Sequence, residues 1–249
     1  MEEIKQIVKW LERPELKEPI MVSGVPDSGL VAKIVMDYLI SPLKAKPFVE
    51  IYSYGFSPQV LVKKDGTLDL VKGVLYYVKR DGNDLILFTA DEQPRLPEAA
   101  YSICNDVLDL IKELGVKIVY TVGASITGTF VDEPKVYGVA THPKLLPDLK
   151  KHGIIIMNSG TITWMNGLMF ALTKIKDMEG IFISAETSGY IADAKAARAI
   201  VAKLNEILNL NLSLEGFNEM IEEMERTVRS LKGMEPYKKL EEGKKEFYR

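Results

Sequence analysis

Residues 20–40 have the sequence IMVSGVPDSGLVAKIVMDYLI, in which three patterns follow one another directly. The first four residues, Ile20 to Ser23, form a short apolar run that predicts a buried strand. Glycine, proline and polar residues from Gly24 to Gly29 predict a tight turn. From Leu30 to Ile40, apolar residues recur at helical spacing. A strand, a turn and a helix in immediate succession predict the first unit of a layered α/β fold.

The same alternation continues over about two hundred residues of the chain. Further strands are expected at residues 74–78, 85–88, 117–122, 136–140, 154–157 and 181–184, and further helices at 97–114, 163–175 and 194–208. The segment Asp81-Gly82-Asn83 predicts a hairpin between two of these strands. Asp193 precedes the helix that starts at residue 194 and is a natural N-cap. The pattern therefore predicts a layered α/β fold with a largely parallel but mixed sheet.

The composition argues against several classes of protein. The 249 residues carry a net charge of −3, so overall charge attracts the chain neither to nucleic acid nor to an anionic membrane. The longest apolar runs are too short to span a bilayer, and the acidic N-terminus does not resemble a signal peptide. A single cysteine excludes an internal disulfide and is typical of a cytoplasmic protein. Few glutamines among many lysines and glutamates favour a thermophilic source.

The segment from Gly24 to Gly29 has the context and the glycine spacing of a phosphate-binding loop. Leu30 stands where such a loop needs a lysine to meet the β- and γ-phosphates. Asp27 would place a negative charge where the anion should bind, and Pro26 removes one backbone donor. We therefore favour a strand-to-helix turn in which Asp27 or Ser28 caps the helix.

The segment GASIT, residues 123–127, nearly matches the nucleophile elbow of α/β-hydrolases around Ser125. Thr127 replaces the second glycine of that motif. A catalytic triad would also need a histidine, and of the two in the chain, His142 follows the serine in the required order while His152 sits at an expected helix end. The incomplete motif therefore argues against a hydrolase.

The remaining polar groups do not form a visible catalytic set. Asp91, Glu92 and Glu186 follow expected strands, but the sequence shows no acid–base partner for any of them. Two histidines and one cysteine provide no metal-ligand cluster, and Cys104 is in phase with the apolar face of its helix. The sequence thus predicts no catalytic residue, no cofactor and no metal site.

The last expected helix carries a narrow apolar stripe whose members recur at intervals of four, three, four and three. They are Phe217, Ile221, Met224, Val228 and Leu231. The helix either packs on its own core, which we favour, or forms a contact between subunits. The residues after it are rich in mixed charge, so we expect them to be flexible or loosely docked. The chain is therefore divided into a core domain (1–212), an amphipathic helix (213–232) and a tail (233–249).

Several segments, in their order and spacing, resemble the proteasome assembly chaperone family, and in particular its archaeal members. These segments are Gly24 to Val31, Val122 to Gly128, Asn158 to Thr163, Glu186 to Gly189 and Asp193 to Ala197. The resemblance implies a three-layer α/β/α sandwich with a mostly parallel mixed sheet, similar to the nucleoside phosphorylase fold but without its catalysis. It also implies homo-oligomers, tetrameric in one archaeal type and pentameric in another.

The chain ends in Phe247-Tyr248-Arg249, which matches the HbYX pattern (hydrophobic residue, tyrosine, any residue) of proteasome activators. In that class of protein, such tails enter pockets between neighbouring α-subunits of the core particle and help to open its gate. The terminal carboxylate can pair with a lysine, while Phe247 and Tyr248 supply apolar area. The resemblance thus implies a proteasome-interacting protein, an assembly-chaperone homologue or an ATP-independent activator, with these three residues as the partner-binding site.

Two alternatives stay open at this point. The tail could be latched on its own core, as the resemblance implies for the pentameric type, and the chain would then be a scaffold for another protein. The chain could instead be an enzyme or a binder of small molecules that uses the glycine-containing loops at Gly24, Gly123 and Gly160. A polar pocket shared by those loops, with perturbed titratable groups, would favour the second alternative.

Overall fold

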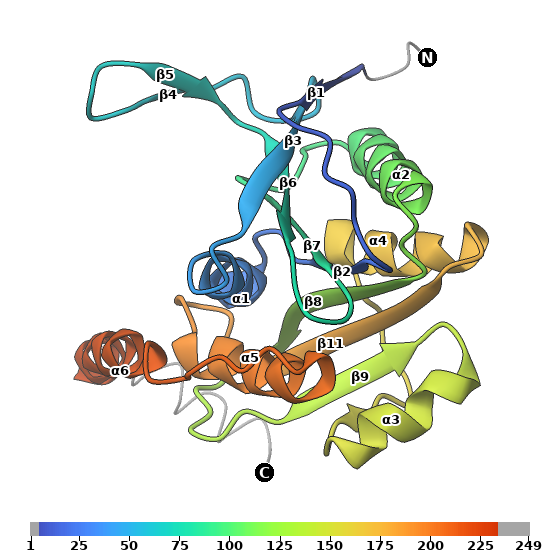
Figure 1. The fold of residues 1–249 in the computed structure, drawn as a ribbon. Coiled ribbons are helices and arrows are strands. Elements are labelled where there is room, and N and C mark those ends of the chain that lie inside the picture. Colours follow the sequence, from blue (N-terminus) through green and yellow to red (C-terminus); the bar gives the residue numbers. More distant parts are fainter. Residues whose placement is uncertain (1–4, 234–249) are drawn as a thin grey trace.

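The computed structural model describes residues 5–233, and Figure 1 shows their arrangement. In this part of the chain the middle layer is a nine-stranded sheet with the order β1-β3-β6-β7-β2-β8-β11-β9-β10. Its strands are β1 (Gln6–Trp10), β2 (Ile20–Ser23), β3 (Lys46–Ser53), β6 (Gly73–Val78), β7 (Leu85–Ala90), β8 (Ile118–Ile126), β9 (Val136–Ala140), β10 (Ile155–Ile156) and β11 (Glu179–Thr187). The strands β4 (Val60–Val62) and β5 (Leu68–Leu70) form a separate hairpin.

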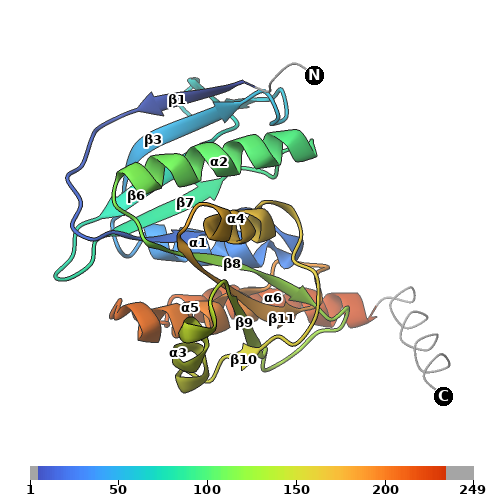
Figure 2. The same cartoon turned by 90° about the vertical axis from the view of Figure 1, so that its right-hand side faces the viewer.

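Helices cover both faces of the large sheet (Figures 1 and 2). On one side lie α1 (Val31–Ile40), α5 (Ala194–Leu208) and α6 (Phe217–Gly233), and on the other lie α2 (Pro97–Glu113) and α4 (Trp164–Ile175). The short α3 (Leu146–Lys151) contacts β9 and β10. Each side has its own apolar core, one around α1 and α5 and the other around α2 and α4. The expected three-layer α/β/α sandwich is therefore confirmed.

The sheet is mixed, as expected. β7, β2, β8 and β11 are neighbours that run parallel to one another, and they form the centre of the sheet. β1, β3, β6 and β7 pair in antiparallel fashion on one side, and β9 pairs antiparallel with β11 on the other. The predicted hairpin at Asp81-Gly82-Asn83 joins β6 to β7, and Gly82 adopts the positive φ of 106° that its turn requires.

The apolar stripe of α6 packs on the core of the same chain. The side chain of Phe217 is fully buried, and its ring stacks on Tyr38 of α1 with a centroid distance of 4.0 Å. Met224, two turns further along, is also buried, while Ile221 packs against the core at its margin. The α6 helix is therefore attached mainly by its first half, as a surface helix with one apolar stripe.

The β4–β5 hairpin extends from the body of the molecule and is anchored at its base by Lys72 (Figure 1). The ammonium group of Lys72 lies 2.8 Å from a carboxylate oxygen of Asp69 in β5 and 2.6 Å from one of Glu50 in β3. Burial opposes the charge of Lys72, but hydrogen bonds from its ammonium group to the two carboxylates raise its pKa overall. The hydrogen bond from Lys72 also holds the pKa of Asp69 at about 2. These contacts fix the direction in which the hairpin leaves the body.

We expect the substitution Lys72→Met to loosen this hairpin without unfolding the protein. The methionine keeps the length of the side chain but removes both ion pairs, so cleavage by trypsin at Lys63 or Lys64 should become several-fold faster. The free energy of unfolding should fall by about 1–2 kcal/mol, because a partly buried pair is broken. Lys33→Met, which removes an ion pair on α1, is the control. An unchanged cleavage rate would show that Lys72 does not hold the hairpin.

Candidate functional site

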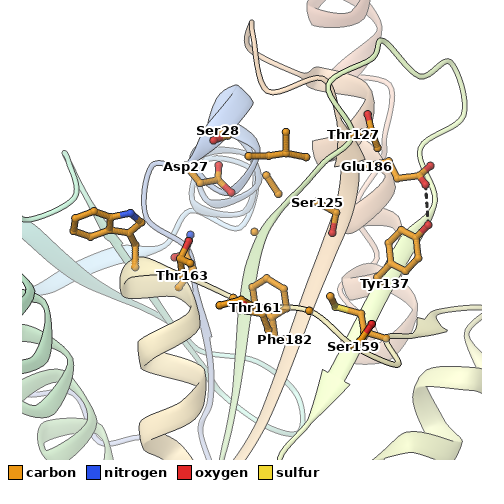
Figure 3. Close-up of a pocket in the computed structure, with 18 of the residues that line it drawn as sticks. Asp27, Ser28, Ser125, Thr127, Tyr137, Ser159, Thr161, Thr163, Phe182 and Glu186 are labelled. Atoms are coloured by element: carbon orange, nitrogen blue, oxygen red, sulfur yellow. Dashed lines mark hydrogen bonds between the residues drawn. The ribbon is translucent and has the colours of Figure 1, made fainter. Parts of the chain in front are cut away.

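The carboxyl ends of β2, β8 and β11 lie side by side at one edge of the sheet, because these three strands run parallel. β2 continues through α1 to β3 on one side, whereas β8 continues to β9 on the other. Ligands of open α/β sheets bind at such a point, where the connections diverge. A cavity of about 1040 Å³ lies here, and Figure 3 shows its walls. They come from the loop after β2, the ends of β8 and β11, and the loop before α4.

Asp27 lies in the loop after β2, and its two carboxylate oxygens have different surroundings. Its Oδ1 atom accepts a hydrogen bond of 3.0 Å from the backbone N–H of Ala32. Asp27 therefore caps the first turn of α1 through its side chain, as expected, although the N-cap position itself is occupied by Leu30. Its Oδ2 atom is buried beside Gly123 of β8. The backbone N–H of Ala124 lies near enough to the Asp27 carboxyl group to lower its pKa, but Oδ2 accepts no hydrogen bond of good geometry from residues 5–233. Burial raises the pKa of Asp27 from its usual 3.8 to about 7, and backbone N–H groups oppose this only in part.

Glu186 lies at the end of β11, on the other side of the cavity from Asp27 (Figure 3). Its Oε1 atom accepts a hydrogen bond of 2.8 Å from the hydroxyl group of Tyr137, and Oε2 accepts one of 3.1 Å from the backbone N–H of Lys135. The hydrogen bond to Glu186 raises the pKa of Tyr137. Both carboxylate oxygens keep a free lone pair for a further donor.

Two amide side chains tie the loops of the cavity together. Asn166 of α4 accepts a hydrogen bond of 2.9 Å from the backbone N–H of Val25 and donates one of 3.0 Å to its carbonyl oxygen. Gln93, which follows β7, donates to the carbonyl oxygen of Pro26 and accepts from the backbone N–H of Met165. The loop after β2 is therefore clamped to the start of α4. Neither residue was predicted from the sequence as part of a site, although Asn166 is a polar residue within an apolar helix.

The loop before α4 forms the remaining wall and ends in an exposed aromatic ring. Gly160 adopts a φ of 138°, a conformation that L-residues rarely take, and Trp164 has a φ of 59° at the start of the helix. Trp164 is 53% exposed and lines the cavity. Positive φ is uncommon for an aromatic residue, and such conformations cluster at ligand sites and switch regions.

The structure does not assemble the hydrolase triad that the GASIT segment suggested. The hydroxyl group of Ser125 bonds to that of Ser184 at 2.7 Å. Ser125 is paired with residue 186 of β11, whereas Ala140, two residues before His142, is paired with residue 181. Five residues of a strand span about 17 Å, so Ser125 and His142 lie near opposite ends of the strands.

Other candidate residues have structural partners. Asp91 accepts a hydrogen bond from the backbone N–H of Lys72, and Glu92 accepts hydrogen bonds from the backbone N–H and the hydroxyl group of Ser57. Cys104 is buried in the core, as expected, and burial raises the pKa of its thiol. Among residues 5–233 no cluster of histidine, cysteine or acidic side chains could hold a metal ion. No helix in the same range is both long and apolar enough to cross a membrane.

The predicted partner-binding residues, Phe247, Tyr248 and Arg249, lie outside the described part of the chain. Within the described part of the chain, the structure brings together four of the five segments on which the family resemblance rested. Those around Asp27, Ser125, Ser159 and Glu186 all contribute to the walls of one cavity.

Comparison with known proteins identifies the family to which these segments belong. The sequence profile described as PAC2 family matches residues 21–232, which is most of the chain. The chain belongs to the PAC2 family. Within this PAC2 chain, the match begins in β2 and ends in α6, so it includes the sheet, the cavity and the attached helix. The expected relationship to the proteasome assembly chaperone family is confirmed.

Relatives of this PAC2 protein come from thermophilic archaea. The chain is 30% identical over 221 residues to an uncharacterized protein, MJ1210, of Methanocaldococcus jannaschii, and the match covers 88% of this chain and 85% of that protein. Its structure is similar to that of Pyrococcus furiosus PbaB, described as an archaeal proteasome activator, with a TM-score of 0.86 and 32% identity. That match covers 91% of this chain and 98% of PbaB.

A second solved structure shows the same fold at lower identity. Pyrococcus furiosus PbaA, described as an archaeal homolog of proteasome-assembly chaperone, matches with a TM-score of 0.77 and 24% identity. The match covers 97% of this chain and 96% of PbaA. The PAC2 fold is therefore common to both Pyrococcus proteins and to this chain. The similarity to the nucleoside phosphorylase fold stays a prediction.

Proposed function

We propose that this PAC2 protein interacts with the proteasome, as an assembly-chaperone homologue or as an ATP-independent activator. The observation that carries the proposal is the similarity to PbaB, a protein described as a proteasome activator, over nearly the full length of both chains. The C-terminal sequence supports it independently, because Phe247-Tyr248-Arg249 fits the HbYX pattern at the required end. The partner would be the α-subunits of the core particle, with the three terminal residues in the pockets between neighbouring subunits.

The physical chemistry of the terminal residues suits such a pocket. The terminal carboxylate can form a charge-assisted hydrogen bond with a lysine, and capture of a C-terminal carboxylate is a known mode of peptide recognition. The ring of Tyr248 brings apolar area together with one hydroxyl group that fixes its orientation, and Phe247 adds a second apolar anchor.

The length of the segment after α6 is sufficient for this role. Sixteen residues follow Gly233, and a fully extended chain of that length spans at most about 50 Å. A random coil of the same length averages roughly 20 Å from end to end. We propose that the protein acts as a homo-oligomer, a tetramer or a pentamer, because several tails on one particle would raise the avidity for a ring of equivalent pockets.

The test is hydrolysis of a fluorogenic peptide by a purified archaeal core particle. The full-length protein should stimulate hydrolysis several-fold, and a variant that lacks residues 247–249 should leave the basal rate unchanged. Replacement of Lys244 and Lys245 by alanine is the matched control, because it alters the same tail but leaves its last three residues intact. The melting temperatures of all variants should agree, so that a difference in stimulation cannot come from unfolding.

Two further readouts separate the roles that the proposal contains. A protein that binds the core particle through its tail without stimulating hydrolysis, but accelerates assembly of the particle from separate α- and β-subunits, would be a chaperone rather than an activator. If the truncated protein binds and stimulates as well as the full chain, the tail is not the docking element and the proposal fails.

A further inference from the structure

The cavity at the carboxyl ends of β2, β8 and β11 has acidic groups but no basic group. Asp27 and Glu186 contribute carboxyl groups, and no lysine, arginine or histidine of the described residues lines it. Around these carboxyl groups stand hydroxyl groups that make no hydrogen bond to residues 5–233. They belong to Ser28, Ser159, Thr161 and Thr163. An anionic ligand would meet only repulsion here, whereas a cation would be attracted from two sides.

The charge of Asp27 is not explained by its structural role. Capping of α1 uses only Oδ1, and an asparagine would cap the helix equally well without a charge. The second oxygen is buried without a hydrogen bond of good geometry, and the nearby backbone N–H of Ala124 offsets only part of the cost for a carboxylate. Buried polar groups that the fold leaves unpaired are commonly paired by a ligand. The geometry therefore favours a ligand that compensates this carboxylate.

We propose that this cavity binds a small organic cation, namely a short aliphatic amine or diamine in its protonated form. One ammonium group would interact with Asp27 and, in a diamine, the other with Glu186, which borders the cavity from the opposite side (Figure 3). The free hydroxyl groups would accept the remaining N–H donors. The carbon chain would pack on Trp164 and Phe182, whose rings can also attract the cation. Such a site combines apolar walls with a few converging polar groups.

Binding should depend on pH through Asp27. The groups that face its carboxyl are the backbone of β8, the first turn of α1, and across the cavity Glu186 and Tyr137, while Asp193 lies behind the turn at Gly29. A cation binds the ionised carboxylate better than the neutral acid. Since the pKa of Asp27 lies at about 7, the affinity for an amine should rise several-fold between pH 6 and pH 8.

Titration calorimetry with three ligands of equal length and different charge tests the proposal. Putrescine, 1,4-butanediol and succinate share a four-carbon skeleton and are cationic, neutral and anionic at pH 8. Putrescine should bind the full-length protein, and the other two should bind at least tenfold more weakly. Asp27→Asn and Glu186→Gln should each weaken binding of putrescine about tenfold, whereas Glu222→Gln, a carboxylate-to-amide change on exposed α6, should not.

Three results would overturn the proposal. One is binding of succinate or butanediol as tight as that of putrescine. Another is an Asp27→Asn/Glu186→Gln double variant that keeps its melting transition and still binds putrescine as tightly as the parent. The third is absence of putrescine binding at millimolar concentration. Deletion of residues 247–249 should leave amine binding unchanged, so the cavity and the proposed tail function can fail independently.

Discussion

Replacement of Phe217 by alanine should lower the free energy of unfolding by about 3–5 kcal/mol, which is typical for truncation of a buried phenylalanine. Phe217 is the first residue of α6, its side chain is fully buried, and its ring stacks on Tyr38 of α1. The hydroxyl group of Tyr38 in turn donates a hydrogen bond of 2.6 Å to the carbonyl oxygen of Ser213, in the segment that leads into α6. An alanine would leave a cavity where the connecting segment, α1 and α6 meet.

The measurement is urea-induced unfolding followed by circular dichroism, combined with hydrogen exchange of α6. Met220→Ala is the matched control, because Met220 lies on the same helix turn but is 37% exposed, and its loss should cost less than about 1 kcal/mol. Hydrogen exchange in Phe217→Ala should be accelerated along α6 first. If Phe217→Ala and Met220→Ala destabilise equally, α6 is not part of the cooperative core, and the PAC2 match would extend beyond the core.

The sequence predicted the apolar elements of the fold well and the polar ends of strands poorly. The strand at residues 20–23 and the helix at 194–208 were predicted with the bounds that the structure shows. β8 and β11 are longer than expected, because their last residues are small or polar and resemble a loop. In the structure, residues 123–126 pair with residues 184–187. Pairing between the two strands therefore holds these residues in an extended conformation that their own strand propensity does not favour.

Four strands were not predicted at all: β1 and β3 of the large sheet, and β4 and β5 of the separate hairpin. β1 and β3 carry lysine, glutamate and proline among their apolar residues, and β1 forms an edge of the sheet. Charged residues are common on edge strands, where they discourage pairing with other chains, and they weaken the alternating pattern that identifies a strand. For the short helix α3, only the end at His152 was expected, since six residues are too few to show helical periodicity.

From the sequence, ligand binding at this site could be predicted only on the condition that its loops share a pocket. The loop at Gly24 was interpreted as a strand-to-helix turn, and a shared polar pocket with perturbed titratable groups was named as the feature that would favour ligand binding. The structure shows such a pocket and the raised pKa of Asp27. The clamps made by Asn166 and Gln93 could not be foreseen, because their partners lie about 70 or more residues away in the sequence. The interpretation of the C-terminal tail stays a prediction.

Asp27→Asn should stabilise the protein at pH 8, by roughly 2–4 kcal/mol, and this gain should disappear near pH 4. The folded-state pKa of Asp27, about 7, is higher than the usual value of 3.8, because burial disfavours the ionised form. Between these two values the folded protein holds a proton that the unfolded chain releases, so the contribution of Asp27 to stability falls as the pH rises from about 4 to about 7. Above pH 7 the penalty is complete, and asparagine avoids it while its side-chain oxygen still caps α1.

Urea titrations of both proteins at pH 4 and pH 8 measure this difference, with Glu222→Gln as a control for loss of an exposed carboxylate. A variant that is less stable than the parent at pH 8 would show that the ionised carboxylate is stabilised by contacts within the fold. If Asp27→Asn stabilises the protein and also abolishes putrescine binding, the charge of Asp27 opposes folding of this PAC2 protein but is required to bind the ligand. Such a trade-off is expected of a residue retained for binding.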